Sequence, residues 1–163
     1  MGLPMNRFVL MIAAGLLATV GTQASASRSC TTPDNVNALA SEIARGMNAS
    51  RAANGQSQVS FNRKLGQAAM AHACDMASND FFGHRGTDGS NSSARVRAAG
   101  YNHCLVGENL AWGYPRSEQI ISGWMNSAGH RNIMLHPRIQ EFGIGITMGP
   151  KGPNWVLVVA KSC

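Results

Sequence analysis

The stretch Phe142-Gly-Ile-Gly-Ile-Thr147 alternates large apolar residues with glycine and threonine, which is the pattern of a half-buried β-strand. It is followed by Gly149-Pro-Lys-Gly-Pro153, a composition typical of a turn. The apolar run from Trp155 to Lys161 has the length and composition of a return strand. The end of the chain is therefore predicted to form an antiparallel hairpin.

Helical periodicity dominates the residues before this hairpin. A first helix is expected after Asp34, as N-cap, and it should end at Asn54-Gly55. Ser117 is the expected N-cap of a later helix. Further helices are expected at about 62–78, 92–99 and 129–135, and a strand at 105–112. Because helices come first and the hairpin last, the predicted class is α+β with a mostly antiparallel sheet.

The first 26 residues are predicted to be a signal peptide that is removed. Arg7 gives a positive start, Phe8–Val20 is largely apolar, and Ala24-Ser25-Ala26 has the small-x-small spacing of a cleavage site. The apolar segment would span roughly 20 Å as a helix, short of the roughly 30 Å hydrocarbon core, which disfavours a membrane anchor. Residues 27–163 are then one exported domain, secreted or periplasmic.

The charge of the chain favours anionic partners without indicating nucleic acid. Its 14 lysines and arginines against 8 acidic residues give a net charge of +6, which favours lipid headgroups or cell-wall polymers. The basic residues are scattered, so no nucleic-acid patch is predicted. After the signal peptide the apolar run Trp155–Ala160 is too short to span a membrane. We expect a monomer without a transmembrane segment.

Four cysteines in an exported chain predict two disulfides. The preferred pairing joins Cys30 to Cys163, because domain termini often lie close together, and Cys74 to Cys104, which would clamp the loop between them. Two alternatives stay open: Cys30–Cys74 with Cys104–Cys163, and Cys30–Cys104 with Cys74–Cys163.

Three polar residues stand out from their surroundings. His84 lies in a glycine-rich loop, Glu108 in an apolar strand, and His130 at the start of a helix. A buried carboxylate is costly unless it is paired, so Glu108 is the best single indicator of a site. Alternatively the histidines are ordinary loop and cap residues, and Glu108 pairs with Arg131. His72 is expected in the core.

Several motifs occur in order along residues 34–160. They are Asn48-x-x-Arg51, Phe82-x-His84 with Asp88-Gly89, Arg97-x-x-Gly100-Tyr101, Gly107-Glu-Asn-Leu-Ala111, Gly123-Trp-Met-Asn-Ser-x-Gly-His-Arg131, Gly143-x-Gly145 and Trp155. Together they resemble the CAP superfamily of cysteine-rich secretory, antigen 5 and pathogenesis-related proteins, also called the SCP domain. The short spacing of the last motif is similar to that of the compact bacterial branch.

This resemblance implies an α-β-α sandwich in which two histidines and two acids line a cleft. Carried over by motif, these are His84, His130 and Glu108, while the position of the second acid holds Ser127. The two histidines would be the ligands of a divalent metal such as zinc, bound through neutral imidazole nitrogens with solvent completing the shell.

Three kinds of function follow from the resemblance. The first is a secreted binding or interaction module for a lipid, sterol or cell-envelope ligand. The alternative is a metal-assisted or general-base hydrolase that uses His84, Glu108 and His130. The third is a purely structural or protective secreted protein. The superfamily has no single reaction to carry over, so the sequence leaves open whether the chain is an enzyme.

Overall fold

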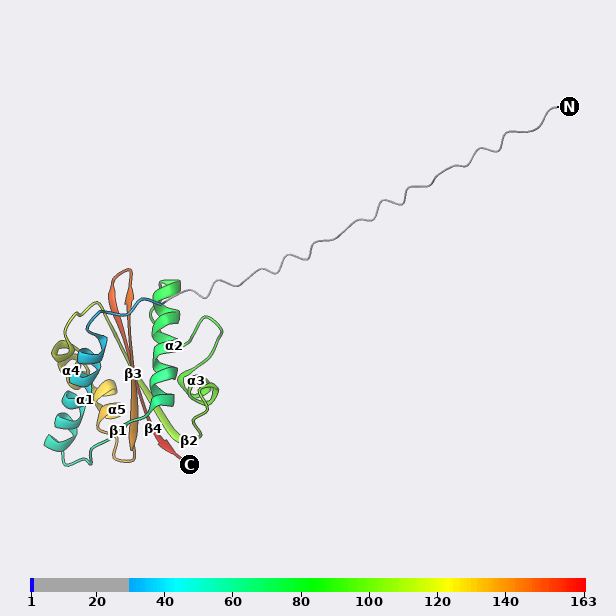
Figure 1. Cartoon of the computed structure of the whole chain (residues 1–163). Coiled ribbons are helices and arrows are strands. Elements are labelled where there is room, and N and C mark those ends of the chain that lie inside the picture. Colours follow the sequence, from blue (N-terminus) through cyan, green and yellow to red (C-terminus); the bar gives the residue numbers. More distant parts are fainter. Residues whose placement is uncertain (2–29) are drawn as a thin grey trace.

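The computed structural model of the chain describes Met1 and residues 30–163 (Figure 1). Apart from Met1, the predicted signal peptide of residues 1–26 lies outside the described residues, so its removal stays a prediction. None of the helices in the described part is long and apolar enough to cross a membrane.

Five helices and four strands make up the described part of the chain. The helices are α1 (Val36–Ala53), α2 (Arg63–Asn79), α3 (Ser92–Ala98), α4 (Ser117–Asn126) and α5 (Ala128–Met134). The strands are β1 (Ser60–Phe61), β2 (His103–Trp112), β3 (Glu141–Gly149) and β4 (Gly152–Ser162). They form one sheet in the order β1-β3-β4-β2, in which β1 is parallel to β3 and the other pairs are antiparallel.

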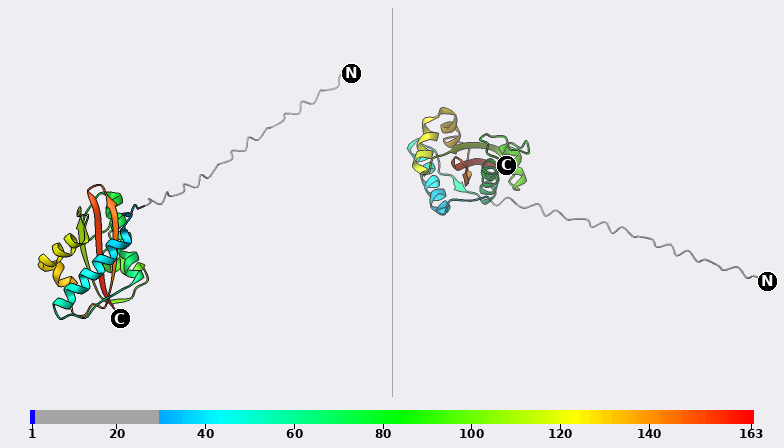
Figure 2. Two further views of the ribbon diagram at one scale, coloured as in Figure 1. Left: turned by 60° about the vertical axis from the view of Figure 1, so that its left-hand side comes forward. Right: turned by 90° about the horizontal axis from the view of Figure 1, so that it is seen from above.

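The sheet is the middle layer of an α-β-α sandwich. Helices α1, α4 and α5 cover one face and helices α2 and α3 the other (Figures 1 and 2). The alternation along β4 divides the core in the same way, because Trp155 and Leu157 pack with α1 and α4 whereas Val156 and Val158 pack with α2. The predicted α+β class and mostly antiparallel sheet are confirmed; the two-residue strand β1 was not predicted.

Glycines in β3 allow α2 to lie directly against the sheet. Ile144 and Ile146 point to the α1 side, and the alternating Gly143 and Gly145 face α2. A Cβ atom on either glycine would come within 3.0 Å of the α2 backbone at Leu65–Gly66 or Ala69–Met70. The strand is therefore buried on both faces rather than half-buried as predicted, because α2 packs directly on the face that carries the glycines.

The two expected N-caps are wrong. Asn35 precedes α1 and gives no side-chain cap, and Arg116 is the N-cap residue of α4. Ser117 is instead buried inside α4, where its hydroxyl donates to the carboxylate of Glu42 on α1. The Ser117 hydroxyl, which the local pattern predicts to cap the helix, thus bonds to a side chain on another helix instead.

The preferred disulfide pairing is also wrong: Cys30 is bonded to Cys74, and Cys104 to Cys163. The described chain begins beside α2 and ends at the opposite end of the sheet, so the termini that were expected to meet do not (Figure 1). Antiparallel pairing of β2 with β4 sets His103 opposite Ser162, and this brings the Cα atoms of Cys104 and Cys163 to 4.9 Å. Neither the strand order nor this register can be read from cysteine spacing.

Gly143→Ala should destabilise the protein by about 3 kcal/mol or more, because the new methyl group meets backbone rather than a side chain that can move. The matched control is Gly123→Ala in α4, where a Cβ finds nothing within 4 Å and helix propensity favours alanine. Urea unfolding of both variants measures the difference. Equal stabilities would show that α2 does not depend on this contact.

Candidate functional site

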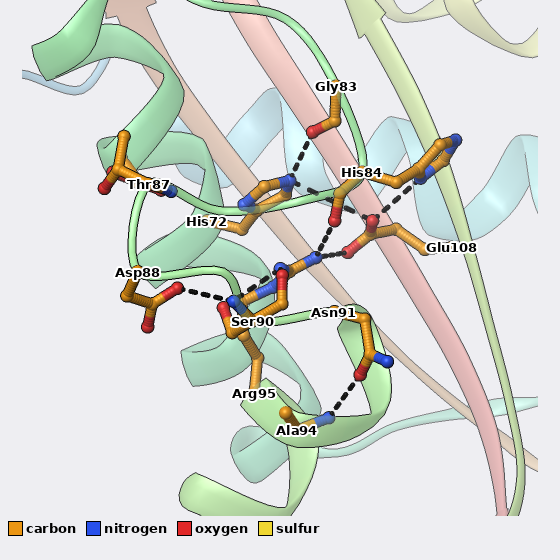
Figure 3. A network of polar contacts seen from close by, with 11 residues as sticks. His72, Gly83, His84, Thr87, Asp88, Ser90, Asn91, Ala94, Arg95 and Glu108 are labelled. Carbon is orange, nitrogen blue, oxygen red and sulfur yellow. Dashed lines mark hydrogen bonds and ion pairs between the residues drawn. The ribbon is translucent and has the colours of Figure 1, made fainter.

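Glu108 lies in β2 and is almost completely buried, with 2% of its side chain exposed. Its Oε1 accepts a hydrogen bond of 2.9 Å from Nδ1 of His84, and its Oε2 accepts one of 2.7 Å from Nη2 of Arg95 (Figure 3). Because an ionised carboxylate only accepts, Nδ1 of His84 carries a proton. The His84 side chain is 63% exposed, so its other ring nitrogen faces outward.

Arg95 of α3 connects this carboxylate to the loop that carries His84. Its Nη2 also donates to the carbonyl of His84 at 3.1 Å, and its Nη1 donates to the carbonyl of Ser90 at 3.0 Å. One buried guanidinium therefore bonds Glu108 and both ends of the loop 84–90. Arg131, the alternative partner considered for Glu108, instead donates to the carbonyl of Met125.

His72 supports the same loop from α2. It is buried, as predicted, and its Nε2 lies 2.8 Å from the carbonyl of Gly83 and 4.0 Å from Oε1 of Glu108. Since a carbonyl only accepts, Nε2 is the protonated nitrogen. Burial lowers the pKa of His72, and of the nearby charges Glu108 opposes and Arg95 adds to this shift. His72 is thus a neutral donor to the loop, and its contact with Glu108 is not an ion pair.

Two carboxylates fix the outer part of the loop. Asp75 of α2 accepts from the backbone N–H of Thr87 at 2.8 Å and from its hydroxyl at 2.6 Å. Asp88 accepts from the N–H of Ser90 at 2.8 Å, and hydrogen bonds from Ser90 lower the pKa of Asp88. Gly86 lies between these groups, where a Cβ atom would come within 3.1 Å of the Asp75, Asp88 and Ser90 side chains.

His130 enters the site from α5. Its carbonyl accepts from Nδ2 of Asn109 at 3.0 Å, which ties α5 to β2 beside Glu108. Burial and, to a smaller extent, the charge of His84 lower the pKa of His130. The structure thus joins His84 to Glu108 directly and puts His130 within electrostatic reach of His84; in the described chain the hydrogen-bond partners of the Glu108 carboxylate are His84 and Arg95.

The described residues do not fit a metal site with three protein ligands. No group of three or more histidine, cysteine, aspartate or glutamate side chains within residues 30–163 could hold a metal ion together. The Nδ1 atom of His84 is committed to Glu108, and Ser127 stands where the resemblance requires an acid. Zinc sites in proteins use at least three protein ligands as a rule. The described side chains therefore do not fit a zinc site of the usual kind.

An aromatic groove adjoins this network. It is a cavity of 280 Å³ whose lining includes Phe82, Leu110, Trp112, Tyr114, Ile120, Trp124 and His130. The rings of Phe82 and Trp112 are stacked with their centroids 5.3 Å apart, and both residues are more than 40% exposed. Phe82 belongs to the loop that Arg95 and His72 hold, so the polar network also positions a wall of the groove. A larger cavity of 610 Å³ between α1 and α4 contains none of the predicted site residues.

The sequence motifs led to His84, Glu108 and His130 but not to Arg95 or His72. Arg95 lies in a short helix with no unusual pattern around it, and His72 has the spacing of a core residue. A buried carboxylate such as Glu108 needs a basic partner, and this requirement could have pointed to an arginine. The chain has several arginines, however, and the requirement does not choose among them. The exposure of Trp112, at 41%, is likewise a feature that no local pattern marks.

A model of the cysteine-rich secretory protein family (CAP) matches residues 44–160. The uncharacterized protein YkwD of Bacillus subtilis is 29% identical over 113 residues, which are 69% of this chain and 44% of that protein. The uncharacterized membrane protein YlbC of the same organism is 26% identical over 99 residues, which are 61% of this chain and 29% of that protein. The chain spans less than half the length of these curated relatives.

Two solved bacterial structures have the same fold. An extracellular protein with an SCP domain from Bacillus anthracis superposes with a TM-score of 0.73 at 22% identity, over 82% of this chain and 45% of that one. An outer surface protein from Borrelia burgdorferi gives a TM-score of 0.75 at 15% identity, over 83% of this chain and 100% of that one. At these identities the likeness shows the fold alone.

His72→Gln should flatten the dependence of stability on pH. Burial lowers the pKa of His72 below its ordinary 6.5, so below about pH 6.5 the unfolded chain binds a proton that the folded chain does not. The wild type therefore loses stability as the pH falls through this window, and glutamine keeps an N–H donor for Gly83 without titrating. Urea unfolding at about pH 7.5 and about pH 5.5 compares the two. Identical losses in both proteins would contradict this account of His72.

Proposed function

Because this chain belongs to the cysteine-rich secretory protein family, in its bacterial branch, we propose that it is an exported binding module for a lipid, sterol or other cell-envelope ligand with an apolar body. The ligand lies in the aromatic groove beside His84 and His130. The observation that carries this proposal is that both oxygens of Glu108 are already bonded.

A carboxylate that acts as a base needs an oxygen that reaches the proton to be removed. In Glu108 one oxygen accepts from His84 and the other from Arg95, and 2% of the side chain is exposed. Glu108 is therefore a positioning residue, which orients His84 and holds the loop that carries Phe82. The groups that remain accessible include the aromatic rings of the groove, His130 and one nitrogen of His84.

The groove has the composition of a site for an apolar ligand. Small-molecule sites are concave and mostly apolar, with a few polar groups that fix orientation, and commonly measure about 300–1,000 Å³. The aromatic groove, at 280 Å³, lies just below this range and includes His130 as a polar group. It therefore suits part of a lipid or sterol better than a large polar substrate.

Export is supported by three independent features. The apolar N-terminal segment has a cleavage-site pattern, the four cysteines form two disulfides, and the structural neighbours are described as extracellular or outer-surface proteins. Disulfides persist in oxidising compartments, which agrees with a secreted or periplasmic location.

Trp112→Ala should weaken binding of a fluorescent fatty acid or sterol probe by about tenfold or more, because it removes an aromatic wall of the groove. The matched control is Phe61→Ala, which removes an aromatic ring in β1 that is 58% exposed, against 41% for Trp112, and which should leave binding unchanged. Equilibrium titration with the probe measures both. Failure of every such probe to bind the wild type would overturn the proposal.

A hydrolase is the second candidate, and one observation favours it. His84 is held at Nδ1 by a buried carboxylate and exposes its other nitrogen, which is how a histidine general base is commonly oriented. Peptidase and esterase assays of the purified protein, with and without added zinc, test it. Any activity found should fall at least about 100-fold in His84→Ala. Activity that survives this change, or none at all in the wild type, would end this candidate.

A further inference from the structure

Phe82 and Trp112 line two cavities. One is the aromatic groove, and the other is a smaller cavity of 160 Å³, here called the hairpin hollow, whose lining includes Asp80, Phe81, Lys151 and Asn154. Both cavities are lined by the stacked Phe82 and Trp112, whose rings are inclined by only 21°. A ligand that lies across this pair of rings would therefore contact both hollows.

The hairpin hollow is lined by the ammonium group of Lys151, which is held only by weak surface interactions. Nζ of Lys151 lies 5.1 Å from the centroid of the Trp112 ring and 3.6 Å from Oδ1 of Asp80. The side chains of this ion pair are 58% and 60% exposed, and such surface pairs contribute little to stability. The Lys151 ammonium can therefore turn toward an incoming anion at little cost in stability.

The position of Lys151 beside Trp112 is set by the backbone. The N–H of Gly113, the residue after Trp112, donates to the carbonyl of Pro153 at 2.9 Å. This bond holds the turn between β3 and β4 against the end of β2. The lysine and the exposed indole are thus presented together by two segments that are fixed to each other.

The other end of the binding surface has no comparable charge. The lining of the aromatic groove includes His130 but no lysine, arginine, aspartate or glutamate. The surface is therefore asymmetric, because the lining of the aromatic groove carries no lysine whereas that of the hairpin hollow includes Lys151.

We propose that the ligand is an amphiphile with an apolar chain and an anionic head group, whose chain lies in the aromatic groove and whose head group pairs with Lys151 in the hairpin hollow. This inference rests on the proposed function and names the class of ligand. Asp80 limits the affinity, because its carboxylate repels the head group and competes for Lys151.

Two lysolipids with the same lauroyl chain test the proposal. Lauroyl lysophosphatidylglycerol carries a negative net charge, and lauroyl lysophosphatidylcholine carries none. Each is titrated below its micelle concentration into the wild type, Lys151→Gln and Asp80→Asn. Tryptophan fluorescence reports on the groove because Trp112 is 41% exposed whereas Trp124 and Trp155 are 1% and 0% exposed. Trp112→Phe should abolish the signal, and thermal unfolding checks that each variant is folded.

The wild type should bind the anionic lipid about threefold to tenfold more tightly than the neutral one. Lys151→Gln should remove this preference and leave the affinity for the neutral lipid unchanged, whereas Asp80→Asn should increase the preference. Equal binding of both lipids, or a preference that survives Lys151→Gln, would overturn the anionic head-group site and leave the proposed function standing. Failure of both lipids to bind the wild type would overturn this inference and the proposed function together.

Discussion

The carboxylate of Glu108 can be buried in an apolar strand because Arg95 and His84 each bond one of its oxygens. An unpaired carboxylate there would be strongly unfavourable, so the three residues are interdependent. Their contacts have consequences beyond the charge balance. The same Arg95 holds the backbone of His84 and Ser90, and the loop that begins at Phe82 is thereby fixed beside Trp112. One internal ion pair thus helps to position the exposed aromatic rings of the groove.

The network around Glu108 depends on the position of α2, because this helix carries His72 and Asp75. The helix lies against β3 at Gly143 and Gly145, so its side chains reach the loop at hydrogen-bonding distance. The disulfide from Cys74 to Cys30 holds the start of the described chain to the same helix. Structural and functional roles of these residues are therefore hard to separate: loss of α2 packing would also disorganise the site.

The sequence predicted the α+β class and the hairpin, and it singled out Glu108 as a buried carboxylate in need of partners, because each of these rests on a local pattern. Alternation over Phe142–Thr147 and a carboxylate among apolar neighbours can both be read from adjacent residues. The role of Arg95 and the choice among the disulfide pairings could not be predicted in this way. The partner of Glu108 depends on where α3 docks, and the pairing of Cys104 with Cys163 depends on β2 lying beside β4. The exposure of Trp112 likewise depends on where β2 ends.

A double-mutant cycle between Glu108 and Arg95 tests most directly whether this ion pair organises the site. Glu108→Gln, Arg95→Met and the double variant are compared with the wild type by urea unfolding. We predict that each single change costs about 3 kcal/mol, because it leaves a buried partner uncompensated. The double change should cost much less than the sum, with a coupling energy of at least about 1.5 kcal/mol. Additive losses would contradict the account, since they would mean that Glu108 and Arg95 do not depend on each other.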